Sequence, residues 1–197
     1  MKLLVGLGNP GDKYSQVRHN LGFEVINKLV DRLQVTGYSW ENNEKLKSEI
    51  CSLKTDAYSL ILAKPQTFMN QSGIAVSLIA NYYKIAPEDI IIIHDELDLP
   101  LGKIKVRIGG AAAGHHGVES IIEHLGTDKF IRVRLGIGNL KTQSSEHKAI
   151  SMSAEKYVLE PFIHSESGPV KHMIKQALKA LDLLLEKGLE TAQNQFN

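Results

Sequence analysis

Four consecutive isoleucines, Ile90 to Ile93, constrain the fold of this chain more than any other feature. A strand with one face in water alternates apolar and polar side chains, whereas a continuous β-branched run is typical of a strand covered on both faces. Such a strand needs a packing layer above it and another below it. The run therefore predicts an α/β protein whose central strands lie between two layers of helices.

The rest of the chain alternates apolar runs with segments of helical period, which favours the same architecture. Strands are expected near residues 2–7, 49–54, 58–63, 90–94, 103–108 and 131–137, and helices near 21–33, 72–83, 117–125 and 168–187. Residues 34–47 are interpreted as a loop or irregular crossover and residues 192–197 as a frayed end. The prediction is a single-domain three-layer sandwich over residues 1–197, with a twisted, mixed and largely parallel central sheet and helices on both faces.

Size and composition narrow the class of protein. A chain of 197 residues with 43% hydrophobic content suits one substantial core. Its apolar runs are shorter than the roughly 18 residues of a membrane helix, and the single Cys51 excludes an intrachain disulfide. We therefore expect a cytoplasmic protein with no membrane contact.

Charge is spread unevenly along the chain. The net charge is only +1, but residues 101–150 hold eight Lys and Arg residues against four acidic ones. Strand surfaces can be basic without a function, so this excess alone does not establish a nucleic-acid site.

The spacing Gly6-x-Gly8-x-x-Gly11 after the first strand matches a dinucleotide-binding fingerprint. In that motif a helix opens at once and points its amino-terminal amides at a pyrophosphate. Here the helical pattern begins only near Asn20, and Asp31, at the spacing of the fingerprint's acid, belongs to a helical face. Dinucleotide binding is therefore disfavoured.

Polar groups follow several of the predicted strands. If the sheet brings the strand ends together, one pocket holds Asn9, His19, Asn70 and Asp95, and Phe68 with Met69 lines it. A histidine can accept a proton from water, a carboxylate behind it stabilises the imidazolium, and amides can donate to a carbonyl oxygen. These are the groups of general-base hydrolysis without a covalent intermediate.

Other chemistries have less support. A single histidine is more commonly structural, so only the expected neighbours Asn9, Asn70 and Asp95 favour His19 as a base. The chain has no G-x-S-x-G nucleophile motif, and Cys51 has no motif around it. His94, Asp95 and Glu96 are neighbours on a strand and point to alternating faces, so we expect no metal and no cofactor.

The polar segments together resemble the bacterial-type peptidyl-tRNA hydrolase family over nearly the whole chain. The matching residues are Gly6 to Gly11, Tyr14, Arg18 to Gly22, Lys64 and Pro65, Thr67 to Gly73, His94 to Pro100, Gly114, His115, Gly117, and Phe130 to Gly138. The resemblance implies a monomeric cytoplasmic enzyme that hydrolyses the ester between a peptide and the 3′ ribose of tRNA. It implies no cofactor, and the tRNA released returns to translation.

The resemblance also implies roles for single residues. His19 would accept a proton, Asp95 would stabilise its basic form, and Asn9 would contact the peptide carbonyl. Tyr14, Phe68 and Asn70 would line the groove that holds the tRNA end and the first peptide unit. Both aromatic rings could stack on terminal bases.

The basic segment gains a use from the same resemblance, because Lys105, Arg107 and Arg132 could contact tRNA phosphates. The chain departs from the family pattern at His116, in the glycine loop (Gly109 to Gly117), where the family normally has Asn, and we expect His116 to tune substrate binding. The departure keeps open an alternative, a non-catalytic tRNA-binding or RNA-binding relative on the same scaffold.

Overall fold

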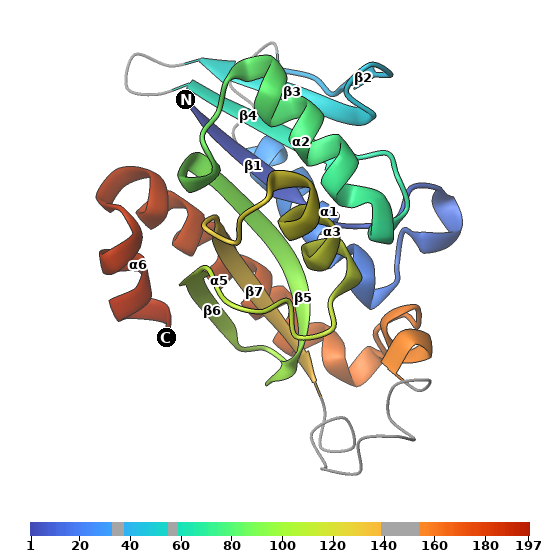
Figure 1. Cartoon of the computed structure of the whole chain (residues 1–197). Helices are drawn as coiled ribbons and strands as arrows, with labels where there is room; N and C mark the ends of the chain where they lie inside the picture. Colours follow the sequence, from blue (N-terminus) through green and yellow to red (C-terminus); the bar gives the residue numbers. More distant parts are fainter. Residues whose placement is uncertain (33–37, 55–58, 139–153) are drawn as a thin grey trace.

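The computed structural model describes residues 1–32, 38–54, 59–138 and 154–197. Its strands form one seven-stranded sheet in the order β2-β3-β4-β1-β5-β7-β6 (Figure 1). The strands are β1 (Lys2–Gly6), β2 (Glu41–Asn43), β3 (Ser48–Lys54), β4 (Ser59–Pro65), β5 (Ile90–Pro100), β6 (Ile104–Ile108) and β7 (Ile131–Gly138). The central strands β4, β1, β5 and β7 are parallel, and the outer pairs β2·β3, β3·β4 and β6·β7 are antiparallel. The predicted mixed sheet with a parallel centre is confirmed.

Helices cover both faces of this sheet (Figure 1). They are α1 (Leu21–Arg32), α2 (Ser72–Tyr83), α3 (His116–Leu125), α5 (Ser167–Lys187) and α6 (Leu189–Phe196). The four isoleucines are fully buried and alternate between two cores: Ile90 and Ile92 pack with α2 and α3, and Ile91 and Ile93 with α1 and α5. The inference of a strand covered on both faces is confirmed.

Strand β5 is longer than expected. The sequence prediction ended it at His94, where polar residues begin, but the strand continues to Pro100. Asp95 and Glu96 stay buried within it because each has partners, and Glu96 accepts a hydrogen bond from Arg134 at 2.9 Å. The partner strand β1 pairs only as far as Ile93, so the next residues of β5 pass beyond the end of β1.

Two further predictions were wrong. Part of the expected loop at 34–47 is β2, a three-residue edge strand too short and polar to show an alternating pattern; residues 34–37 of it lie outside the described part. Residues 192–197, expected to be a frayed end, belong mostly to α6, which buries Ala192. Its neighbour Asn197 bonds both backbone groups of Val106 in β6.

Two glycines fix the start of α1 against the sheet. A Cβ on Gly22 would lie 2.4 Å from the carbonyl oxygen of Ile93 and from the amide nitrogen of Leu7. A Cβ on Gly6 would lie 2.3 Å from the carbonyl oxygen of Gly22. Only glycine allows this approach, which places His19, in the turn before α1, beside the end of β1 and the middle of β5.

Candidate active site

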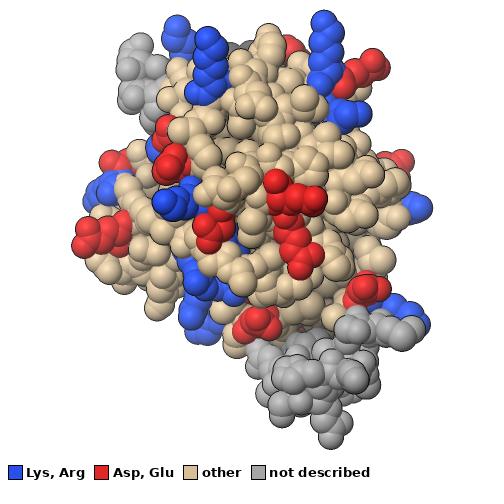
Figure 2. Space-filling view, in the orientation of Figure 1, with Lys and Arg blue, Asp and Glu red and all other residues tan. Residues whose placement is uncertain are grey.

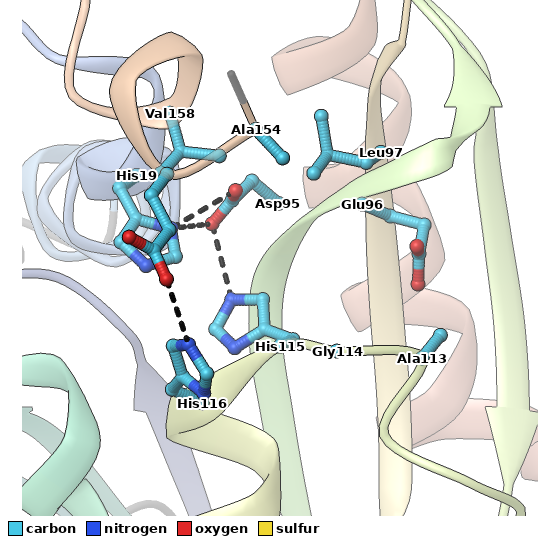
Figure 3. A pocket seen from close by; sticks show the side chains of 11 residues that line it. His19, Asp95, Glu96, Leu97, Ala113, Gly114, His115, His116, Ala154 and Val158 are labelled. Carbon is cyan, nitrogen blue, oxygen red and sulfur yellow. Dashed lines mark hydrogen bonds and ion pairs between the residues drawn. The ribbon is translucent and has the colours of Figure 1, made fainter. Parts of the chain in front are cut away.

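His19 and Asp95 form the centre of the site. His19 lies in a 3-10 turn (Arg18–Asn20) before α1, and Asp95 lies in β5. Nδ1 of His19 is 2.9 Å from Oδ1 and 3.0 Å from Oδ2 of the carboxylate, and both residues are buried (Figure 3). An ionised carboxylate only accepts, so Nδ1 holds the proton and Nε2 keeps a lone pair.

Burial disfavours the protonated form of His19, but the charge of Asp95 and its hydrogen bond outweigh that effect and raise the pKa of the imidazole. Burial also acts against the ionised form of Asp95, but the two imidazoles beside it hold the pKa of that carboxyl well below its usual range. The pair therefore combines a permanent carboxylate with an imidazole that titrates above its ordinary pKa.

A second imidazole contacts the same carboxylate. Nε2 of His115 lies 3.2 Å from Oδ1 of Asp95, and Nδ1 of His115 accepts the backbone N–H of Val118 at 3.3 Å (Figure 3). His115 thereby caps the amino terminus of α3. Sequence reasoning missed this contact, although His115 belongs to the glycine-loop motif.

A third imidazole, that of His94, packs against the ring of His115. His94 is buried and its Nδ1 donates to the backbone carbonyl of Asp95 at 2.6 Å. Its ring packs edge-on against the ring of His115, with centroids 4.7 Å apart. Burial, and then the neighbouring His115, hold the pKa of His94 well below its usual range, so this imidazole is neutral.

Asn9 is held on three sides in the turn after β1. Its backbone N–H donates to Oδ1 of Asn20, and its carbonyl accepts from Nδ2 of Asn20, both at 2.9 Å. Its side-chain Oδ1 accepts the backbone N–H of Met69 at 2.8 Å. With the carbonyl end of the amide fixed, Nδ2 is the donor left for a ligand.

The predicted residues divide between neighbouring cavities. His19, Asp95 and His116 line a cavity of about 290 Å³ whose walls include Leu97 and Val158. Asn9 lines an adjacent polar cavity of about 340 Å³ with Asn20 and Lys64, and Phe68 borders a third of about 470 Å³.

The remaining predicted groove residues lie at or near the surface. Phe68 is 56% exposed, Asn70 is exposed, and Tyr14 is half-buried with the ammonium of Lys13 over its ring. Met69, expected as pocket lining, is buried in the core behind Asn9.

The late start of the first helix, which argued against dinucleotide binding, is confirmed, because α1 begins only at Leu21.

The basic residues of β6 and β7 form a ladder in which Lys105 faces Arg134 and Arg107 faces Arg132. Lys105 and Arg107 are exposed, and Lys and Arg side chains gather over β6 at the lower left of Figure 2. The expectation for Arg132 was wrong, because its guanidinium is buried and donates to the carbonyls of Gly110 and Ala111. Arg132 lies opposite the exposed Arg107, but the carbonyls of Gly110 and Ala111 take its guanidinium away from the surface.

His116 lies at the rim of the cavity between two acids. Its Nδ1 is 3.0 Å from Glu119 and its Nε2 is 3.9 Å from Glu155, and all three side chains are more than half exposed. Figure 3 shows His116 at the start of α3, next to His115. His116, the residue that departs from the family pattern, therefore lines the same cavity as His19 and Asp95.

His19, Asp95 and His115 offer three ligand atoms within 4.8 Å of one another. Sequence reasoning considered metal ligands only among chain neighbours, and these three residues come from separate elements. Ligand atoms at about 2.0–2.1 Å around a tetrahedral zinc ion would lie roughly 3.3–3.4 Å apart. The observed separations of 2.9 and 3.2 Å are hydrogen bonds, so the cluster is suited to holding and moving protons.

No helix among the described residues is long and apolar enough to cross a membrane. The one cysteine, Cys51, is buried, and burial raises the pKa of its thiol, so it is unsuited to act as a nucleophile.

Comparison with known proteins gives full-length matches. The model of the peptidyl-tRNA hydrolase family matches residues 3–197. A peptidyl-tRNA hydrolase of Mycobacterium sp. (strain KMS) is 42% identical over 192 residues, 98% of this chain and 94% of that protein. One from Mycobacterium tuberculosis is 41% identical over 195 residues, 99% of this chain and 96% of that protein. The crystal structure of peptidyl-tRNA hydrolase from Acinetobacter baumannii has a TM-score of 0.88 at 34% identity, covering 100% of this chain and 94% of that one.

Proposed function

Because this chain belongs to the peptidyl-tRNA hydrolase family, we propose that His19, Asp95 and Asn9 are the residues that perform its ester hydrolysis. The chain hydrolyses the ester bond between a peptide, or an N-blocked amino acid, and the 3′ ribose of tRNA, and it releases free tRNA. The observation that supports the assignment best is the contact of His19 Nδ1 with both oxygens of Asp95 at 2.9 and 3.0 Å.

The proposed reaction begins with proton transfer. Nε2 of His19 removes a proton from a water molecule as its oxygen attacks the ester carbonyl carbon. The imidazolium that forms is stabilised by Asp95, which remains ionised. Positioned proton transfer of this kind contributes about 10² to 10⁴ in rate.

Carbonyl polarisation is assigned to Asn9. Its Nδ2 donates to the carbonyl oxygen as negative charge develops there, and its fixed Oδ1 prevents the amide from turning. The C–O bond to the ribose then breaks, and His19 returns the proton to the 3′ oxygen. The ribose hydroxyl leaves more easily than an amine, so the site needs no further acid.

Substrate contacts are proposed for the surrounding residues. Tyr14, Phe68 and Asn70 line the approach of the tRNA end, where the exposed ring of Phe68 and the half-buried ring of Tyr14 can stack on bases. Lys105 and Arg107 contact phosphates, and His116 tunes binding at the cavity rim. We further propose that residues 1–197 act as one domain and one monomer in the cytoplasm, where translation produces the substrate.

A turnover assay tests the proposal. The protein is incubated with N-acetyl-aminoacyl-tRNA, and the release of free tRNA is followed for wild type and for His19→Ala. We expect His19→Ala to lose most turnover while its tRNA affinity stays within a few-fold of wild type. Binding without release in the wild type would instead identify the non-catalytic RNA-binding relative, and equal loss of affinity and turnover in His19→Ala would contradict the general-base role.

A further inference from the structure

His115 has no assigned role in the proposed reaction, yet it contacts the carboxylate on which His19 depends. Asp95 Oδ1 receives two imidazoles at once, Nδ1 of His19 at 2.9 Å and Nε2 of His115 at 3.2 Å. The rings of His19 and His115 lie with centroids 4.9 Å apart, and all three residues are buried. The carboxylate of Asp95 is therefore shared between the imidazoles of His19 and His115.

The protonation of His115 follows from its other nitrogen. Nδ1 accepts the N–H of Val118, so it holds no proton, and the ring's proton is on Nε2 facing Asp95. A second proton on Nδ1 would break this contact and place positive charge at the amino terminus of α3, where the helix dipole opposes it. In this arrangement His115 is therefore a fixed donor to Asp95.

The ring of His115 is also held in place by His94. His94 packs edge-on against it, and Nδ1 of His94 is fixed by the carbonyl of Asp95 itself. His115 therefore cannot turn without disturbing the cap of α3 or this packing.

A carboxylate that receives an extra hydrogen bond has less negative charge to offer its other partner. We propose that His115 is a positioning residue: by donating from Nε2 to Asp95, it fixes the carboxylate against His19 and limits how strongly Asp95 holds His19 as imidazolium. This inference rests on the proposed function, because it matters to turnover only if His19 is the base.

The other groups around the pair are accounted for. On β5 and β7, Glu96 is paired with Arg134, and Arg132 faces the glycine loop. Beside His19, Arg18 is paired with Glu166 at 2.9 Å. Among the described residues, the other titratable groups that line the cavity are His116 and Glu155, and His116 also contacts Glu119 outside it.

The experiment is the pH profile of kcat/KM on N-acetyl-aminoacyl-tRNA. His115→Leu fills a similar volume without a donor, so Asp95 directs its whole charge to His19, and we expect the acid limb to move up by about 0.5–1 pH unit. His115→Gln restores an N–H donor, and its limb should return toward wild type. His124→Gln, a change on the same helix away from the cavity, is the matched control and should leave the limb in place. An acid limb that is unmoved in His115→Leu overturns the proposal.

A second measurement does not depend on any variant folding. In histidine-labelled wild type, two-bond ¹H–¹⁵N correlations report the tautomer of each ring, and His115 should be the tautomer with its proton on Nε2, because its Nδ1 accepts the N–H of Val118. The tautomer with its proton on Nδ1 would overturn the proposal as well. His19→Ala reports on the base itself, so full turnover in that variant would refute the general-base role of His19, whereas the NMR result tests only His115.

Discussion

The backbone of Asn9 and the side chain of Asn20 form a closed pair of hydrogen bonds, each 2.9 Å long, with donor and acceptor at both ends. Asn20 follows His19 directly, so one 3-10 turn supplies both the proposed base and the clamp on the proposed carbonyl donor. The proposed base and the proposed carbonyl donor are thus held to each other through the adjacent residues His19 and Asn20.

Asn20→Asp should uncouple them. The carboxylate can still accept the N–H of Asn9, but its second oxygen repels the Asn9 carbonyl where an amide N–H had donated. We expect kcat/KM on N-acetyl-aminoacyl-tRNA to fall by about 10-fold or more and stability to fall by about 1–3 kcal/mol. Asn27→Asp, an amide-to-acid change at another residue of the same polar cavity, serves as the control for added charge. Unchanged turnover in Asn20→Asp would show that the clamp does not aim Asn9.

The pKa shift of His19 predicts a pH profile. Asp95 raises the pKa of His19 above 6.5, and the base must be unprotonated, so kcat/KM should rise with pH through a midpoint above 6.5. In Asp95→Asn the imidazolium loses its counter-charge, so the midpoint should move to lower pH while the plateau drops by about 10² to 10⁴. A midpoint that moved upward in this variant would contradict the role given to Asp95.

The depressed pKa of His94 predicts a pH dependence of stability. Below pH 6.5 the unfolded chain protonates His94 and the folded chain does not, so the free energy of unfolding should fall on acidification toward pH 5. The slope from one such group is at most about 1.4 kcal/mol per pH unit. His94→Asn keeps a donor for the Asp95 carbonyl without titrating, so chemical denaturation between pH 5 and 7 should show a flatter slope.

Two other groups act in neighbouring pH ranges. The raised pKa of His19 gives stability that is complete below pH 6.5 and lost as pH rises through the folded value. The lowered pKa of Asp95 gives stability that is lost below pH 3.8.

The exposed His172 is the control for the His94→Asn experiment, and His172→Asn should keep the wild-type slope. An equal slope in wild type and His94→Asn would mean that His94 does not stay neutral.

Salt should weaken tRNA binding through the exposed end of the basic ladder. Replacing both Lys105 and Arg107 with Ala should reduce the slope of log affinity against log salt by roughly 0.7–0.9 for each phosphate that the protein no longer neutralises. Arg132→Gln removes a charge from the same ladder, but its guanidinium contacts loop carbonyls, so its salt slope should stay unchanged. A reduced slope in Arg132→Gln alone would reverse these assignments.

His116→Asn restores the amide of the family pattern at the cavity rim. Because the two acid contacts of His116 are solvent-exposed, they contribute little to stability. We expect an activity change of less than about 10-fold, mainly in KM, and far less than the loss in His19→Ala. A collapse of kcat would instead show that the site has been rebuilt around the imidazole.

Most of the fold could be predicted because its signals are long. The isoleucine run and the helical periods of α1, α2, α3 and α5 bury many apolar side chains, and such patterns are visible in one sequence. The three residues of β2 and the eight of α6 are stabilised by their neighbours rather than by a pattern of their own, and both were missed.

The site could be predicted as a set of residues but not as a network. Strand ends brought His19 near Asp95 as expected, yet the second imidazole on Asp95 and the burial of Arg132 depend on where the glycine loop crosses the sheet. Periodicity describes the faces of strands and helices, and it holds no information on the path of a loop of Gly and Ala.

The contact of Asn197 with Val106 bears on how this protein meets its own copies. An exposed edge strand invites another chain to add to the sheet, which is a route to aggregation. At the middle of β6 both the N–H and the carbonyl of Val106 are already bonded by a side-chain amide, and Lys105 and Arg107 flank them with charge. A single asparagine thus takes the place of an eighth strand and closes that edge to intermolecular pairing.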